Sequence, residues 1–256
     1  MSVSEMFSLS GKNAVVTGVG KTTGLCYEMA KALHDAGAKV LLWDILPGVH
    51  NLCRDLGGAG AGYYSVQEDL RDIEAIKRGF TQALDLLGGQ VDVLLNGAGV
   101  QHRCEAIEFP VEKWDLIMDV NLKSVFYLSQ MAARHMIGHG GGKIVNIASL
   151  ASFLGARRIS AYSVSKGGVM QLTKALSNEW AQLGVNVNAI APGIMLTELT
   201  ADNVNTDIGR MHTARIPAGR WGKPEDLCGV AVFLASAASD YISGVTIPVD
   251  GGYLGF

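Results

Sequence analysis

The chain has 256 residues, a net charge of −3 and an apolar fraction of 48%, which suit one large α/β domain with a sizeable core. The small negative charge provides no basic surface for nucleic acid, and no apolar stretch is long enough to span a bilayer. The first ten residues show no charged-then-apolar signal pattern, and the four cysteines form no CxxC pair. We therefore expect a cytoplasmic protein without a nucleic-acid or membrane partner.

Short β-branched runs alternate with longer helical patterns along the chain. Most of the expected strands are apolar on both faces, as in a parallel sheet covered by helices on each side. They are Asn13–Thr17, Lys39–Asp44, Gly62–Val66, Val91–Asn96, Lys143–Ala148, Asn186–Ala191 and Val245–Val249. The expected helices are Gly24–Ala36, Gly48–Leu56, Asp72–Leu87, Val111–Ile137, Ala161–Leu183 and Pro224–Ala235. This alternation predicts one doubly wound, Rossmann-type α/β domain over residues 1–256, with a seven-stranded parallel sheet and helices on both faces.

The least regular stretch is 193–217, directly after the sixth expected strand. Ligands of doubly wound folds bind outside the carboxyl ends of the strands. We therefore expect this stretch to be a mobile lid over a ligand crevice.

A glycine-rich turn follows the first expected strand and opens the first helix, in the run Thr17-Gly18-Val19-Gly20-Lys21-Thr22-Thr23-Gly24-Leu25-Cys26. Glycines let the backbone approach a pyrophosphate, and the helix N-terminus supplies N–H donors and a positive dipole end. Ordinary turns also use glycine where φ is positive, but the strand–turn–helix context favours a dinucleotide site. The expected contacts in this run are Gly18, Thr23, Gly24 and Leu25.

The segment Gly20-Lys21-Thr22 also matches the end of a phosphate-binding P-loop. That motif requires a glycine five positions before its second glycine. Val15 stands there, inside the expected strand, so the dinucleotide interpretation is favoured.

Asp44 ends the second expected strand, and no lysine or arginine immediately follows it. An acidic group there can bond both ribose hydroxyls of NAD and would repel the 2′-phosphate of NADP, so we expect NAD. The alternative role is a helix N-cap or a solvated turn residue. Two later segments can also reach the cofactor. Asp69-Leu70 can face its adenine, and the small residues of Asn96-Gly97-Ala98-Gly99 let the backbone approach it.

Tyr162 and Lys166 are four residues apart in an expected helix and therefore share one face. A nearby ammonium favours the phenolate and lowers the tyrosine pKa from about 10, so that Tyr162 can act as a general acid or base. Ser149, after the fifth strand, can hold a carbonyl or hydroxyl oxygen. Asn121, in an apolar helix, can orient a water or the lysine. Each residue also has a structural alternative. Tyr162 can simply pack against its neighbours, Lys166 can be a solvated surface residue, and Asn121 can be a buried amide whose hydrogen bonds are satisfied.

Together these residues resemble the short-chain dehydrogenase/reductase family over essentially the whole chain. The resemblance rests on Thr17-Gly18, Asn96-Gly97-Ala98-Gly99, Asn121, Ser149, Tyr162-Ser163-Val164-Ser165-Lys166, Pro192-Gly193 and Val249-Asp250-Gly251-Gly252. It implies a catalytic tetrad of Asn121, Ser149, Tyr162 and Lys166, with Lys166 bonded to the nicotinamide ribose. It also implies a homotetramer, and nicotinamide contacts from Pro192, Gly193, Ile194 and Thr197.

The nucleotide end departs from the family pattern in three ways. The usual turn reads TGxxxGxG, and the turn from Thr17 to Gly24 is two residues longer. Cys26 stands at the usual third glycine, and Gly97 stands where a second asparagine is usual. We therefore expect a reshaped pyrophosphate loop.

A narrower resemblance is to the 2-dehydro-3-deoxy-D-gluconate 5-dehydrogenases and gluconate 5-dehydrogenases. It rests on Val100-Gln101-His102-Arg103, Glu108-Phe109, Lys123-Ser124-Val125-Phe126, Asn178-Glu179-Trp180-Ala181 and Ile216-Pro217-Ala218-Gly219-Arg220-Trp221-Gly222. It implies a sugar-acid substrate. Guanidinium groups match the geometry of carboxylates. The candidate substrate contacts besides Ser149 and Tyr162 are therefore Arg103, His102, Arg157 and Arg158. The alternative for each of these four is a solvated position on the surface.

Other functions stay open. The substrate can instead be another polyol, a ketosugar or a 3-oxoacyl compound, and the altered glycine turn also suits a catalytically silent nucleotide-binding regulator or a structural protein. His135 and His139 are four residues apart, but no third metal ligand is evident. We expect both to be solvated helix-end residues, with no metal.

Overall fold

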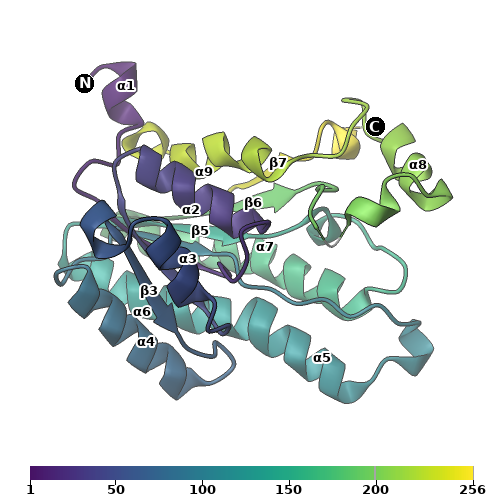
Figure 1. Cartoon of the computed structure of the whole chain (residues 1–256), viewed down its shortest axis with the longest axis horizontal. Coiled ribbons are helices and arrows are strands. Elements are labelled where there is room, and N and C mark those ends of the chain that lie inside the picture. The colour runs from purple at the N-terminus through teal and green to yellow at the C-terminus, as the bar shows by residue number, and fades with distance from the viewer. Residues whose placement is uncertain (199, 256) are drawn as a thin grey trace.

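The computed structural model describes residues 1–198 and 200–255 (Figure 1). These residues form a seven-stranded parallel sheet in the order β3-β2-β1-β4-β5-β6-β7. The strands are β1 (Asn13–Thr17), β2 (Lys39–Asp44), β3 (Tyr63–Gln67), β4 (Val93–Asn96), β5 (Gly142–Ile147), β6 (Val185–Pro192) and β7 (Thr246–Val249). The predicted doubly wound fold is confirmed, with each predicted strand end within two residues of the observed one.

Helices cover both faces of the sheet (Figure 1). One layer contains α2 (Leu25–Asp35), α3 (Val49–Asp55) and α9 (Cys228–Ala235), and the other contains α4 (Ile73–Leu86), α6 (Ser124–Gly138) and α7 (Ser160–Trp180). Successive side chains of a strand point to opposite faces, so Ala14 and Val16 pack into the first layer while Val15 packs into the second. No helix in the described part of the chain is both long and apolar enough to cross a membrane.

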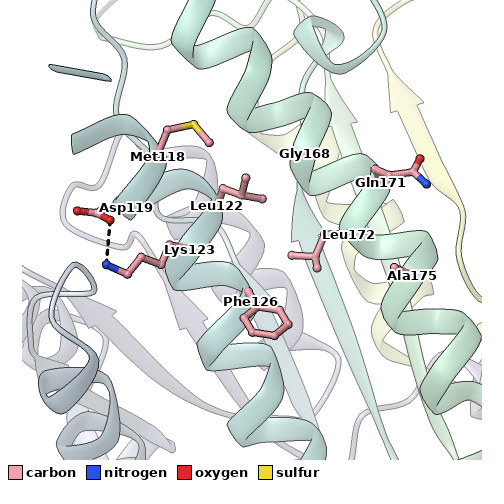
Figure 2. A pocket seen from close by; sticks show the side chains of 9 residues that line it. All are labelled: Met118, Asp119, Leu122, Lys123, Phe126, Gly168, Gln171, Leu172 and Ala175. Carbon is pink, nitrogen blue, oxygen red and sulfur yellow. Dashed lines mark hydrogen bonds and ion pairs between the residues drawn. The ribbon is translucent and has the colours of Figure 1, made fainter. Parts of the chain in front are cut away.

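An apolar groove of about 580 Å³ runs along the outer side of the second layer (Figure 2). It lies between α7 and the helical segment that contains α5 (Val111–Met118) and α6. An Asp119–Lys123 ion pair lies on the α5–α6 side of the groove. Its apolar lining consists of Met118, Leu122, Phe126, Leu172 and Ala175.

Two helical predictions are wrong in detail. The helix predicted over Val111–Ile137 is divided into α5 and α6 by a π-helical turn, Asp119–Lys123. The stretch 193–217, predicted to be irregular, contains α8 (Asp207–Ala214). Its N-cap is Thr206, whose hydroxyl accepts a hydrogen bond from the Gly209 N–H, a local signal that the sequence analysis missed.

Candidate active site

The expected ligand crevice lies where the strand order reverses, between β1 and β4. The chain passes from β1 to β2 and β3 on one side, and then returns to place β4 on the other side of β1. Ligands bind outside the carboxyl ends of the strands at such a reversal. The ends of β1, β2 and β4 are Thr17, Asp44 and Asn96, so the fold brings three of the predicted nucleotide segments to one edge.

The floor of this crevice is made of closely approaching backbone. Gly18 has a φ of +82°, and a Cβ on it would lie 2.7 Å from the Ala98 Cα, so this position requires glycine. The Thr17 hydroxyl accepts hydrogen bonds from the N–H groups of Gly97 (3.0 Å) and Ala98 (3.2 Å). These contacts tie the glycine turn to the end of β4.

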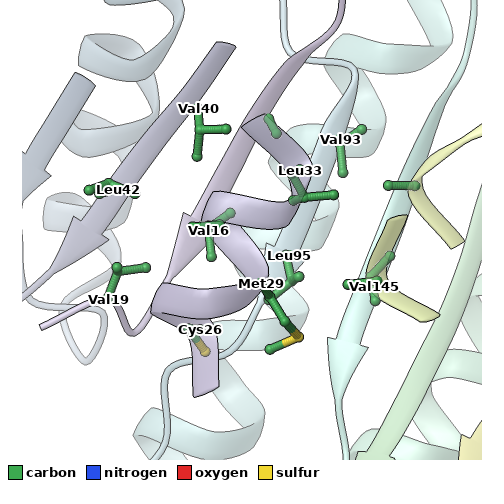
Figure 3. Packing of buried hydrophobic residues seen from close by; sticks show 14 of the residues in the cluster. Val16, Val19, Cys26, Met29, Leu33, Val40, Leu42, Val93, Leu95 and Val145 are labelled. Atoms are coloured by element: carbon green, nitrogen blue, oxygen red, sulfur yellow. The ribbon is translucent and has the colours of Figure 1, made fainter. Parts of the chain in front are cut away.

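The two unusual residues of the nucleotide end lie against each other. Cys26 is buried in the first turn of α2 (Figure 3), and a Cβ on Gly97 would overlap its Sγ. Burial raises the pKa of Cys26 to about 12, so the thiol is a neutral packing group and not a nucleophile. The cysteine therefore takes the space that a side chain at position 97 would need.

The longer loop, 19–23, passes beside Asp44. A Cβ on Gly20 would lie 2.8 Å from a carboxylate oxygen of Asp44, so the loop comes close only because this residue is glycine. The Leu46 N–H donates a hydrogen bond of 2.9 Å to the same carboxylate. Burial raises the pKa of Asp44, and no described lysine or arginine contributes to the shift. The end of β2 therefore presents a carboxylate without a cationic partner.

The N-terminus of α2 faces the same loop. Gly24 is the N-cap and makes no side-chain cap, so the N–H groups of Leu25 and Cys26 have no partner among the described residues and are available to an anion, whereas the Tyr27 N–H is bonded to the Gly24 carbonyl. The Thr23 hydroxyl donates a 3.1 Å hydrogen bond to the Glu198 carboxylate. This bond joins the nucleotide loop to the stretch 193–217.

The other predicted cofactor contacts are partly engaged within the protein. The Asp69 carboxylate is paired with Arg71, which lowers the pKa of Asp69, and Leu70 is buried. The Thr197 N–H donates to the Thr200 hydroxyl at 2.8 Å. A ligand would therefore meet a carboxylate at position 69 that already has a cationic partner.

The chain after β6 passes close to the end of β7. Pro192 ends β6, and the N–H of Gly193 donates to the Val249 carbonyl at 2.9 Å. A Cβ on Gly193 would lie 2.6 Å from the Asp250 Cα, so the approach requires glycine. Ile194, the next residue, packs against a buried cluster below the stretch 193–217.

Ser149, Tyr162 and Lys166 come together as the sequence predicted. Lys166 is buried in α7 and donates a 2.6 Å hydrogen bond to the Ile147 carbonyl at the end of β5. Its Nζ lies 5.9 Å from the centroid of the Tyr162 ring, and Tyr162 is hydrogen-bonded to the Ser149 side chain. The Ala151 N–H donates to the Ser149 hydroxyl at 3.1 Å, which fixes this hydroxyl beside the phenol.

Burial changes the proton affinity of both titratable groups. It lowers the pKa of Lys166 to about 8. It raises the pKa of Tyr162, although the hydrogen bond to Ser149 acts in the opposite direction. The expected net fall in the tyrosine pKa is therefore wrong for this structure, because desolvation of the phenolate is the larger effect. Tyr162 is a neutral phenol here, beside an ammonium that titrates close to neutral pH.

Asn121 lies in the π-helical turn and is fully buried. Its amide accepts a 2.8 Å hydrogen bond from the Val100 N–H and donates a 2.9 Å bond to the Val100 carbonyl. It also donates to the Ser165 hydroxyl at 3.1 Å, and Ser165 in turn donates to the Tyr162 carbonyl. The asparagine thus links the segment after β4 to α7, and π turns are frequent at functional sites. Sequence reasoning missed Ser165, although it directly precedes Lys166.

The predicted substrate contacts have different surroundings. Arg158 has a positive φ of 66° and pairs with Glu105 at 3.4 Å, so it ties two loops together. His102 packs edge-on against the Phe109 ring. Arg103 is exposed in the segment after β4 and forms no ion pair among the described residues. Arg103 is therefore better placed than Arg158 to meet a ligand.

His135 and His139 stack with ring centroids 4.0 Å apart. The Val91 N–H donates to His135 Nε2 at 3.2 Å, and burial lowers the pKa of His135. His135 is therefore half-buried rather than solvated as expected, and it joins α6 to the start of the segment that leads into β4, whereas His139 is exposed. Within residues 1–198 and 200–255, no group of three or more His, Cys, Asp or Glu is placed to hold a metal ion.

A family model described as enoyl-(acyl carrier protein) reductase matches residues 18–254. The 2-dehydro-3-deoxy-D-gluconate 5-dehydrogenase of Escherichia coli (strain K12) is 47% identical over 97% of this chain and 97% of its own. The gluconate 5-dehydrogenase of Gluconobacter oxydans (strain 621H) is 40% identical over 98% of each chain.

A solved structure shares the fold over its full length. The gluconate 5-dehydrogenase from Burkholderia cenocepacia J2315, in complex with NADP and tartrate, is 36% identical. It superposes with a TM-score of 0.93 and covers 100% of both chains. The chain belongs to the short-chain dehydrogenase/reductase family, whose members are nicotinamide-dependent oxidoreductases.

Proposed function

We propose that this protein is an NAD(H)-dependent dehydrogenase that interconverts a secondary alcohol and a ketone on a sugar acid such as 2-dehydro-3-deoxy-D-gluconate or gluconate. The observation that carries the proposal is the cluster of half-buried Ser149 and Tyr162 with buried Lys166, near the carboxyl ends of the strands. The names of the Escherichia coli and Gluconobacter oxydans relatives support the sugar-acid substrate.

Each member of the tetrad has a defined task in this proposal. The Ser149 hydroxyl holds the substrate oxygen, and Tyr162 gives that oxygen a proton during reduction or takes it during oxidation. The Lys166 ammonium favours the phenolate that this exchange creates. Asn121 holds the segment after β4 in place through its two bonds to Val100. The nicotinamide supplies the hydride chemistry when it is bound.

The crevice residues suit a dinucleotide, because the glycines at its floor leave no room for a Cβ and the first turn of α2 has available N–H groups. We assign the pyrophosphate to the loop and the start of α2, and the nicotinamide to the chain after β6. The pyrophosphate contacts are Gly18, Thr23, Gly24 and Leu25, the adenosine contacts are Asp44, Asp69, Leu70, Asn96, Gly97 and Ala98, and the nicotinamide contacts are Pro192, Gly193, Ile194, Thr197, Tyr162 and Lys166.

NAD is the proposed cofactor because Asp44 has no cationic partner among the residues that the structure describes. Its carboxylate can accept hydrogen bonds from the ribose hydroxyls, whereas a 2′-phosphate would meet a like charge. The Burkholderia cenocepacia relative was solved with NADP, so the choice needs a direct test in this chain.

We propose that the protein is a cytoplasmic homotetramer in which two copies meet across the α5–α6 and α7 groove. The groove offers Met118, Phe126 and Leu172 to the surface (Figure 2), and interfaces between identical chains have an apolar centre. Four free cysteines suit a reducing compartment. Light scattering on the purified protein checks the assembly, and Phe126→Glu is expected to yield smaller species.

The deciding experiment is a scan at the nicotinamide absorbance with NAD and NADP against uronate-derived keto acids, gluconate, simple polyols and acyl thioesters. The highest kcat/KM is expected with NAD and a sugar acid. Activity confined to polyols or acyl thioesters would replace the substrate class and keep the enzyme class. Nucleotide binding by calorimetry without any turnover would identify a regulator.

A further inference from the structure

The segment 147–152, which contains Ser149, is fastened at both ends to one residue of α7. At its start, the Lys166 ammonium donates a 2.6 Å hydrogen bond to the Ile147 carbonyl. At its end, the Ser152 hydroxyl donates a 2.6 Å hydrogen bond to the Lys166 carbonyl. Ser149 lies between these two bonds in the chain, so its place relative to α7 depends on both of them.

The Ser152 hydroxyl also binds the backbone of Ser149. The Ser149 N–H donates to this hydroxyl at 3.3 Å, and the Ser152 N–H donates to the Ser149 carbonyl at 2.9 Å. A hydroxyl has one proton to donate and two lone pairs that accept. Ser152 gives its proton to Lys166 and accepts from Ser149, so a single oxygen joins the backbones of two members of the tetrad.

The two bonds to Lys166 differ in how constant they can be. The ammonium is also the group that the proposed function gives to the nicotinamide and to the phenolate, so it cannot serve the Ile147 carbonyl alone. The Lys166 carbonyl belongs to the backbone of α7, which helical hydrogen bonds hold in place. The bond from Ser152 is therefore the one that holds the segment while the ammonium takes part in the reaction.

The position of the Ser149 hydroxyl has narrow limits. It is hydrogen-bonded to Tyr162 and accepts the Ala151 N–H at 3.1 Å. In the proposed function it also holds the substrate oxygen, and a misplacement of about 1 Å can slow an enzymatic reaction about 100-fold. Because Tyr162 lies on α7, the site requires a fixed distance between the backbone of Ser149 and this helix.

We propose that Ser152 is a positioning residue, which keeps the Ser149 hydroxyl beside Tyr162 by joining the backbones of Ser149 and Lys166. The inference rests on the proposed function, because it takes Ser149 as the residue that holds the substrate oxygen. The donor and an acceptor site of Ser152 are both used within the protein, so Ser152 acts through Ser149. Its effect on the reaction should therefore exist only while the Ser149 hydroxyl is present.

A double-mutant cycle with Ser149→Ala tests this dependence, with gluconate or the faster substrate that the nicotinamide-absorbance scan identifies. Ser152→Ala is expected to lower kcat about tenfold, while KM and the calorimetric Kd for NAD stay within about twofold. In the Ser149→Ala background, the same substitution should change kcat less than about twofold, because no hydroxyl is left to position. Ser152→Thr keeps the donor and should retain kcat within about threefold of the wild type.

Ser177→Ala is the matched control. Ser177 lies about three turns further along α7, and its hydroxyl donates a 2.7 Å hydrogen bond to the Ser243 hydroxyl of a neighbouring segment. The substitution removes the same kind of bond from the same helix, but away from the tetrad. It should leave kcat unchanged with and without Ser149, and urea unfolding compares the stability of the two alanine variants.

The outcomes separate this inference from the function on which it rests. If Ser152→Ala lowers kcat by the same factor with and without Ser149, or does not lower it at all, the positioning role is wrong and the function stands. A Ser152→Thr variant as slow as Ser152→Ala, or a parallel loss of kcat and of affinity for NAD, would also overturn it. If the wild type turns over no substrate in the scan, the proposed function fails and the inference fails with it.

Discussion

The two ends of the crevice are built in different ways. At the chemical end, long polar side chains are buried and each is tied to backbone, as Lys166 is to Ile147 and Asn121 is to Val100. At the phosphate end, there is almost no side chain at the floor, and residues 21–23 of the loop are exposed. The chemical end therefore depends on particular donors and acceptors, whereas the phosphate end depends on empty space and accommodates a longer loop.

The largest expected effect is at the chemical end. Tyr162→Phe removes the hydroxyl that we propose exchanges the proton, and should lower kcat by about 10²- to 10⁴-fold, measured by NADH absorbance. The Kd for NAD should change little, because the ring and its packing are kept. Tyr241→Phe is the control, since Tyr241 is fully exposed. Near-normal turnover of Tyr162→Phe would show that another group handles the proton.

The phosphate end should instead be sensitive to added side-chain volume. Gly97→Ala places a Cβ where the Cys26 sulfur lies, and such overpacking costs about 1–3 kcal/mol. Lower stability in urea and a weaker Kd for NAD are expected. Adding Cys26→Ala should restore part of the stability and part of the affinity for NAD in the double variant. The Thr17 carbonyl oxygen, 2.9 Å from the added Cβ, limits this recovery. Strictly additive effects in this double-mutant cycle would show that the two residues are independent.

The buried ammonium predicts a pH dependence of stability. The folded pKa of Lys166, about 8, lies below its ordinary value of 10.5, so the unfolded chain binds more protons between these values and stability rises with pH there. Burial of the Lys166 ammonium lowers the free energy of unfolding by its full amount below about pH 8, and by progressively less as the pH rises toward 10.5. Relative to Lys166→Met, the wild type should gain about 2 kcal/mol of unfolding free energy from roughly pH 7 to 9.5. Urea titrations of both proteins across this range measure it, and a constant difference would contradict the buried charge.

The smallest of these effects is the change of cofactor preference at Asp44. Asp44→Ser removes an unpaired carboxylate from the end of β2, so the ratio of kcat/KM for NAD over NADP should fall about tenfold. Asp35→Ser, an exposed charge at the far end of α2, is the control. A wild type that already prefers NADP would refute the role given to Asp44.

Much of this arrangement was accessible from the sequence. The strands follow from apolar runs whose ends are marked by glycine and polar residues, so β1 and β2 were predicted to the residue. The Tyr162–Lys166 pair follows from helical spacing, which is a local property. The capping signal at Thr206 was also local and was overlooked, whereas the π turn at Asn121 had no sequence pattern to show it.

Features that depend on distant contacts were not accessible. Cys26 and Gly97 were each seen as unusual, but nothing in the chain order showed that one fills the space left by the other.

By itself, the sequence determined the order and type of the elements and the set of groups available for proton transfer, because periodicity and short motifs are local. Only the tertiary structure decided how those groups behave. Burial is a property of the whole packed fold, and it turned the pKa of Tyr162 upward and that of Lys166 downward, since a charge removed from water loses solvation that no local motif can supply.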